Sequence, residues 1–225
     1  MKEIIYHGSG HIVEKPEYGL GASTNDYGRG FYCTKCLELA KEWACGKGTN
    51  GYANKYELEL DDLKVINLNQ EPYNILNWLA VLTKHRTYWQ NSSISADAKA
   101  YLQEHFYVDI SGYDIVIGYR ADDSYFSFAQ DFVSGTISLQ KLQRAMHLGE
   151  LGEQIVLISK KAFSHIKYLG NESAESYRYY NQKNDRDKRA KQAYKSEKNV
   201  AVNLNELFIL DIMRGNIQNG DSRLQ

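Results

Sequence analysis

The stretch that most constrains this fold is residues 26–34, Asp-Tyr-Gly-Arg-Gly-Phe-Tyr-Cys-Thr, which is followed by a helical pattern. Gly28 and Gly30 flank Arg29, so the backbone here can bend and approach a ligand closely. In residues 37–44 the apolar side chains recur at offsets of three, six and seven, which predicts a helix. We therefore expect a glycine-rich loop, a short strand and a helix in succession.

Two aromatic side chains of this stretch can face one cleft. Tyr32 stands where the loop enters the strand, and Trp43 projects from the following helix. Two rings beside a glycine-rich turn can enclose a flat heteroaromatic ring, with stacking worth about 0.5–1.5 kcal/mol beyond burial. The same residues also suit a strand–helix corner with an aromatic core, and the sequence leaves both interpretations open.

Composition places the chain among ordinary globular proteins. Its 225 residues make one large domain or two small ones, and a net charge of −1 demands neither nucleic acid nor a membrane surface. The apolar runs are too short for a transmembrane helix or a signal peptide, so we expect a cytoplasmic protein without a membrane partner. The three cysteines form neither a disulfide framework nor a paired zinc motif, so no metal is expected: Cys33, Cys36 and Cys45.

Periodicity predicts strands and helices in mixed order along the chain. Strands or extended pieces are expected at residues 4–6, 12–16, 52–60, 63–68, 113–118 and 153–158. Helices are expected at residues 74–85, 96–106 and 139–147.

The composition changes after residue 170. Residues 177–198 hold eight Lys or Arg against three Asp or Glu, and they read as a tyrosine-rich helix. Such a run is either a solvated helix or a surface that tracks a nucleic-acid backbone. Residues 204–212 are expected to form a strand or helix that packs back on the core. We therefore treat residues 171–225 as a helical extension of the same domain.

Three short motifs stand out in order along the chain. They are His7-Gly8-Ser9 after the first strand, the Gly-Arg-Gly-Phe-Tyr run of residues 28–32, and Glu153-Gln154 at a late strand. In this order they resemble the ADP-ribosyltransferase superfamily, and more narrowly its diphtheria-toxin and poly-ADP-ribose-polymerase branch. Residues 1–170 also resemble a bacterial family, once known only as a domain of unknown function, of ADP-ribosyltransferase toxins.

That resemblance implies an α+β fold, namely a split antiparallel β-sandwich with surrounding helices, with residues 1–170 as the catalytic domain. It implies mono-ADP-ribosyl transfer from NAD to a macromolecular acceptor, with release of nicotinamide and no metal. It also implies a toxin held by a cognate antitoxin, in a toxin–antitoxin or phage-defence system. The basic run slightly favours nucleic acid, as RNA, over protein as the acceptor. A NAD glycohydrolase and a non-catalytic NAD- or partner-binding module are the alternatives.

The resemblance also implies residue roles. His7 would bind a ribose hydroxyl of the adenosine half of NAD, the Gly8 backbone would pair with the nicotinamide carboxamide, and Ser9 would add a polar contact. Tyr32 would stack on the nicotinamide ring. Further NAD contacts are expected from the residues around these motifs: Arg29, Gly30, Phe31, Ala40 and Trp43.

The late motif is ambiguous because adjacent strand residues face opposite sides. If the strand aligns as in the eukaryotic polymerases, Glu153 takes the place of the catalytic glutamate. If it aligns as in the bacterial family, Gln154 does, and we favour Gln154. A neutral amide would keep the hydrogen bond to the nicotinamide ribose while giving up full charge stabilisation. That would suit single transfer rather than chain formation.

Other polar residues have weaker patterns. Arg29 either meets the NAD pyrophosphate or is solvated, and Arg86 is expected to interact with a helix C-terminus rather than a ligand. Candidates for contact with the acceptor are two turn carboxylates and three basic residues of the extension: Asp122, Asp123, Arg186, Lys188 and Arg189.

Overall fold

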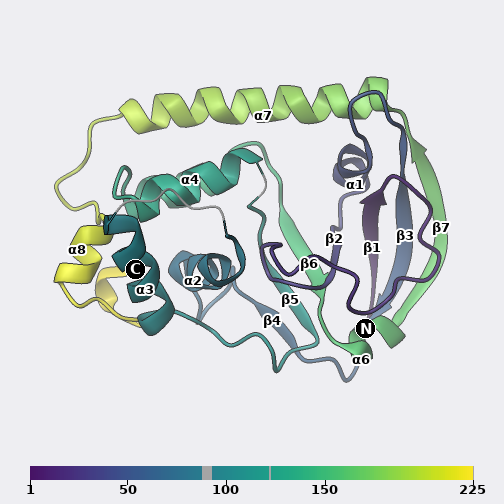
Figure 1. The fold of residues 1–225 in the computed structure, drawn as a ribbon, viewed down its shortest axis with the longest axis horizontal. Helices are drawn as coiled ribbons and strands as arrows, with labels where there is room; N and C mark the ends of the chain where they lie inside the picture. The colour runs from purple at the N-terminus through teal and green to yellow at the C-terminus, as the bar shows by residue number, and fades with distance from the viewer. Residues whose placement is uncertain (88–92, 122, 225) are drawn as a thin grey trace.

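The computed structural model describes residues 1–87, 93–121 and 123–224, which form a mixed α+β fold with two β-sheets (Figure 1). The three-stranded sheet has the order β1-β3-β7, and both of its pairings are antiparallel. Its strands are β1 (Lys2–Ser9), β3 (Gly51–Glu59) and β7 (Ile166–Ala174).

The four-stranded sheet has the order β2-β6-β5-β4. Its edge strand β4 pairs in parallel with β5, so the expectation of wholly antiparallel sheets is wrong at this edge. The reason is that α2 and α3 lie between these strands in the chain, and such a long helical connection returns the chain in the same direction. The strands are β2 (Phe31–Cys33), β4 (Val65–Asn67), β5 (Ile115–Tyr119) and β6 (Glu153–Leu157).

Eight α-helices lie in the described part of the chain. The helices predicted from periodicity all form, and α2 begins as its sequence indicates. The Asn74 side chain accepts from the Leu76 N–H at 2.9 Å, and the Asn77 side chain accepts from the Asn74 N–H at 2.8 Å. The helices are α1 (Leu37–Ala44), α2 (Ile75–His85), α3 (Ser93–His105), α4 (Asp123–Val133), α5 (Leu139–Met146), α6 (Lys160–Ser164), α7 (Ser176–Asn199) and α8 (Ile209–Arg214).

Several expected elements differ from the structure. Residues 12–16 form no strand, because side chains bind the backbone there: Asn54 accepts from the Val13 N–H at 2.9 Å, and the Tyr56 hydroxyl donates to the Val13 carbonyl. The extended piece was therefore a wrong prediction. The helix in residues 204–212 begins only at Ile209. Neither β7 nor α4 was predicted.

Two cores hold the layers together. The larger lies between the four-stranded sheet and the helices, and includes Trp78, Leu79 and Val116. The smaller lies between the two sheets and includes Ile5, Tyr56 and other side chains of both sheets. On β5 and β6 successive residues alternate between these cores, as expected for a sheet that is covered on both faces.

The 24-residue helix α7 crosses the top of the molecule in Figure 1, from the end of β7 toward α8. Its residues Ala190 and Tyr194 belong to the larger core. The Tyr194 ring stacks on Phe128 with centroids 3.9 Å apart, and its hydroxyl donates to Asp131 at 2.6 Å. The C-terminal extension therefore packs on the same core as the rest of the chain, and residue 170 lies inside β7.

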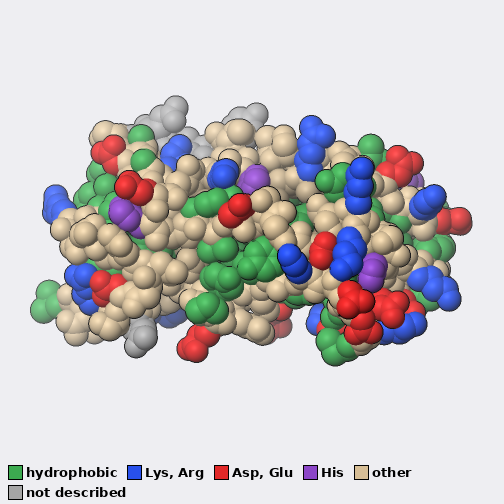
Figure 2. Space-filling view, turned by 90° about the horizontal axis from the view of Figure 1, so that it is seen from below, with side chains coloured by type: hydrophobic (Ala, Val, Ile, Leu, Met, Phe, Trp, Pro, Cys, Tyr) green, Lys and Arg blue, Asp and Glu red, His purple; other side chains and the backbone are tan. Residues whose placement is uncertain are grey.

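The surface mixes charges of both signs. Figure 2, seen from below, shows Lys and Arg side chains interspersed with Asp and Glu, and hydrophobic side chains gathered near the middle of that face. The mixture fits the formal net charge of −1.

We expect the Tyr194→Ala variant to lower the free energy of unfolding by about 3–5 kcal/mol, because it removes a buried ring and leaves a cavity. Tyr194→Phe keeps the stack and loses one hydrogen bond, so it should cost about 1 kcal/mol. Urea unfolding followed by circular dichroism measures both.

The matched control is Tyr177→Ala on the same helix, where the side chain is 87% exposed. Its effect should stay within about 0.5 kcal/mol. Equal effects at both positions would mean that the extension is not part of the core.

Candidate functional site

A cavity of about 490 Å³ lies where β1 and β2 separate. Its wall is formed by both of these strands, by α1 and β6, and by the loop over residues 11–26. Seven of the residues predicted for the site line it: His7, Gly8, Gly30, Phe31, Tyr32, Trp43 and Gln154.

The separation of the strands begins at one pair of hydrogen bonds. The Tyr6 N–H donates to the Thr34 carbonyl at 2.8 Å, and the Thr34 N–H donates to the Tyr6 carbonyl at 2.9 Å. Alternate peptide groups of a strand point to the same edge, so the N–H and C=O of Gly8 point to the same edge as those of Tyr6. In this register Gly8 faces Tyr32, but no backbone hydrogen bond joins the two among the described residues.

Gly8 is required here by close packing. A Cβ on Gly8 would lie 2.0 Å from the Ala40 carbonyl oxygen of α1. Ala40 is fully buried behind β1 and does not line the cavity, so its predicted contact with a ligand is wrong.

The His7 ring is held in one tautomer. Its Nδ1 lies 2.8 Å from the Tyr32 carbonyl oxygen, which can only accept, so Nδ1 carries the proton. Burial lowers the pKa of His7, which favours the neutral ring. Its Nε2 is therefore an acceptor at the wall of the cavity.

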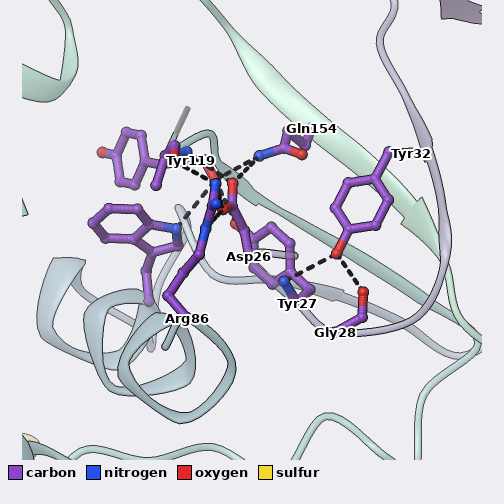
Figure 3. Close-up of polar contacts among 9 residues, drawn as sticks. Asp26, Tyr27, Gly28, Tyr32, Arg86, Tyr119 and Gln154 are labelled. Atoms are coloured by element: carbon purple, nitrogen blue, oxygen red, sulfur yellow. Dashed lines mark hydrogen bonds and ion pairs between the residues drawn. The ribbon is translucent and has the colours of Figure 1, made fainter. Parts of the chain in front are cut away.

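Two hydrogen bonds fix the Tyr32 ring. Its hydroxyl donates to the Gly28 carbonyl at 2.7 Å and accepts from the Tyr27 N–H at 3.1 Å (Figure 3). Burial raises the pKa of Tyr32 far above its ordinary value, so the phenol stays protonated. Trp43 lines the same cavity, but the Arg120 guanidinium lies 3.5 Å from its ring centre and covers one face.

A buried carboxylate ties three elements together beside Tyr32. Asp26 is 4% exposed, and its Oδ1 accepts from Arg86 Nε at 2.7 Å. Its Oδ2 accepts from the Ala121 N–H and from Gln154 Nε2, each at 2.8 Å (Figure 3). Arg86 Nη2 also donates to the Ala121 carbonyl at 2.7 Å. The network therefore joins the glycine-rich loop, the end of α2 and the start of β6.

The two late candidates lie on opposite faces of β6. Gln154 is buried and lines the cavity, whereas Glu153 is exposed and accepts from Asn69 Nδ2 at 3.0 Å. Glu153 does not line the cavity.

The surroundings of three further residues bear on their expected roles. Arg86 lies at the C-terminus of α2, as expected, and it also forms the ion pair with Asp26 and lines the cavity. Arg29 is exposed and donates to the Gly19 carbonyl at 3.3 Å, outside the cavity lining. Ser9 donates to the His11 carbonyl and accepts from Asn54 at 3.2 Å, also outside that lining.

Of the five residues expected to bind an acceptor, the structure describes the side chains of the three basic ones. Arg186 is paired with Glu42 of α1, and its side chain is only 14% exposed, so little of its guanidinium faces solvent. Lys188 lies 3.7 Å from Asp185, and Arg189 is exposed. Asp122 lies outside the described residues, and α4 begins at Asp123, whose side chain is not described.

A metal site and a membrane span have no candidate among the described residues. Within residues 1–87, 93–121 and 123–224, no three His, Cys, Asp or Glu side chains are grouped so that they could hold a metal ion. In the same part of the chain, no helix has the length and apolar character needed to cross a membrane.

The fold and the cavity define a mixed α+β protein with a cavity between two sheets, lined by apolar and polar side chains. The chain belongs to the family described as protein of unknown function (DUF3990), whose sequence model matches residues 3–168. No curated protein and no solved structure matches the chain.

Sequence reasoning missed Asp26, Arg86 and Arg120 as residues of the cavity wall. Asp26 stands at the start of the central stretch, but no periodicity distinguishes it. Its partner Arg86 is sixty positions away in the chain, so only the fold brings them together.

We expect His7 to make stability depend on pH. Because its folded pKa lies below the ordinary value of 6.5, the unfolded chain takes up a proton first as the pH falls. The free energy of unfolding should therefore decrease below about pH 6.5, and this component should be absent from His7→Asn. Urea unfolding at about pH 7.5 and about pH 5.5 measures the difference. An identical pH dependence in both proteins would contradict the buried neutral ring.

Proposed function

We propose that this protein is an ADP-ribosyltransferase that uses NAD as its substrate and transfers ADP-ribose to a macromolecular acceptor. The observation that carries the proposal is the convergence of His7 Nε2, the free edge of Gly8, the Tyr32 ring and Gln154 on one cavity. The packing of two sheets face to face, with a split between β1 and β2, fits the ADP-ribosyltransferase-like sandwich that the sequence motifs imply.

These groups suit the parts of a bent dinucleotide. His7 Nε2 accepts from a ribose hydroxyl of the adenosine half. The N–H and C=O of Gly8 pair with the C=O and NH₂ of the nicotinamide carboxamide, and the ring of Tyr32 stacks on the pyridinium. Gln154 then lies beside the nicotinamide ribose.

The reaction breaks the bond between ribose C1′ and the nicotinamide nitrogen. The bonding pair leaves with the nitrogen, so nicotinamide departs neutral and the ribose gains oxocarbenium character. The Gln154 Oε1 accepts from a ribose hydroxyl, and this bond strengthens as positive charge develops. A nucleophilic oxygen or nitrogen of the acceptor attacks C1′ and gives its proton to solvent.

The acceptor is proposed as a macromolecule, with RNA slightly ahead of protein. The support is the basic character of residues 177–198, but in the described part of the chain ion pairs engage at least five of those eight basic side chains. These five are Arg178, Arg186, Lys188, Lys191 and Lys198. The case for nucleic acid therefore rests on fewer free charges than the sequence indicated. From the resemblance we further propose that the protein is a cytoplasmic toxin, which a cognate antitoxin inhibits and which acts in a toxin–antitoxin or phage-defence system.

The deciding experiment incubates the protein with a bacterial lysate and NAD labelled at its adenylate phosphate. The macromolecular fraction is then divided and digested with ribonuclease, deoxyribonuclease or protease. Label lost with one nuclease or only with protease supports transfer and identifies the acceptor class. Release of nicotinamide without macromolecular label would indicate a NAD glycohydrolase, and no turnover would indicate a binding module.

We expect Gln154→Ala to slow nicotinamide release by roughly 100- to 1000-fold, because it removes an acceptor that acts on the developing charge. The neighbouring variant Glu153→Ala should stay within about threefold, since Glu153 lies on the opposite face of β6. Chromatographic measurement of nicotinamide gives both rates.

Thermal unfolding of both variants serves as the control for folding. A larger loss for Glu153→Ala than for Gln154→Ala would assign the reaction to the exposed face and contradict the proposed site.

A further inference from the structure

We infer that Asp26 is a positioning residue that fixes the orientation of the Gln154 amide, so that its oxygen and not its nitrogen is presented to the cavity. This inference rests on the proposed function and names a residue for it that the sequence motifs did not.

The orientation follows from the partners of the amide nitrogen. Gln154 Nε2 donates to Asp26 Oδ2 at 2.8 Å and lies 3.4 Å from the Tyr119 carbonyl oxygen. Both partners can only accept, so a rotated amide would bring three oxygens together without a proton between them. Among the described residues Gln154 Oε1 has no hydrogen-bond donor, and Figure 3 shows it turned away from Asp26.

Asp26 can perform this role because it cannot turn. Its two oxygens are held by Arg86 and by the Ala121 N–H, and Arg86 is itself held by the Ala121 carbonyl. Asp26 is only 4% exposed, which limits the access of water as a competing donor. The carboxylate is therefore a fixed acceptor aimed at the Gln154 nitrogen.

The orientation of the Gln154 amide decides the sign of the partial charge that lies beside the nicotinamide ribose. An amide oxygen beside the nicotinamide ribose accepts from its hydroxyl and places negative partial charge near the forming cation. An amide NH₂ in the same position would place positive partial charge there and oppose the reaction. Because Asp26 orients the amide, Gln154 can present an acceptor oxygen to the ribose although it carries no negative charge.

The test is a cycle of four proteins: wild type, Asp26→Asn, Gln154→Glu and the double variant. In Asp26→Asn the new side chain keeps its oxygen on Arg86, so its NH₂ takes the place of Oδ2. There it no longer accepts from the Ala121 N–H and donates to Gln154 instead. The glutamine then turns its nitrogen to the cavity. We expect kcat for nicotinamide release to fall at least about tenfold, with a smaller change in KM.

In the Gln154→Glu protein, we expect Asp26→Asn to have the opposite effect on kcat or none. Two equivalent carboxylate oxygens need no orientation, and the Asp26 charge beside them is repulsive. Adding Asp26→Asn to Gln154→Glu should therefore raise kcat or leave it unchanged. A merely structural role of Asp26 would instead lower kcat by a similar factor in both backgrounds, and that result would overturn the inference.

A second measurement is independent of turnover. In proton–nitrogen correlation spectra, the Gln154 side-chain NH₂ should exchange slowly with solvent in wild type and faster in Asp26→Asn. Equal exchange in both proteins would also overturn the inference. The exposed variant Asp185→Asn, which removes the same charge from α7, should change neither readout.

The two proposals fail in different ways. If wild type releases no nicotinamide, with or without lysate, the proposed function is wrong and the role of Asp26 in that reaction falls with it. If wild type is active but the cycle shows equal losses, only the role of Asp26 is wrong.

Discussion

The site depends on two hydrogen bonds between Tyr6 and Thr34, and on the fact that pairing stops there. These bonds join the two sheets at one point. Beyond them the strands separate, so the edge of Gly8 and the ring of Tyr32 face a cavity instead of each other. The absence of a side chain at Gly8 is equally necessary, because α1 packs directly against that residue and carries Trp43 to the cavity. A local failure of strand pairing thus creates the site.

The second constraint is the cost of burying charge beside that cavity. An unpaired buried carboxylate would be strongly unfavourable, and Asp26 is buried only because Arg86, a peptide N–H and Gln154 satisfy its oxygens. The same contacts bring together segments that are far apart in sequence. Stability and orientation of the site therefore have one origin, since the donors that stabilise Asp26 also fix the geometry of Gln154.

Much of the fold could be predicted from local patterns, whereas the site could be predicted only in part. Helices such as α2 have a cap and a clear apolar stripe, but β7 lies at a sheet edge, mixes polar with apolar residues around Gly170 and offers no such signal. His7 and Tyr32 stand in recognisable motifs. The roles of Asp26 and Arg86 become visible only from the ion pair between them. The position of Arg86 at the end of α2 indicated only an interaction with the helix C-terminus. Long-range pairing of polar residues leaves no periodicity in the sequence.

The C-terminal extension belongs to this same physical system. The DUF3990 match ends at residue 168, yet α7 beyond it supplies Tyr194 to the larger core and Arg186 to Glu42. Glu42 is the neighbour of Trp43 on α1, and a largely buried ion pair keeps its geometry only if both partners stay in place. The extension therefore supports the wall of the cavity from behind. At least five of the eight basic side chains of residues 177–198 pair with carboxylates, so much of this positive charge is explained by contacts within the protein.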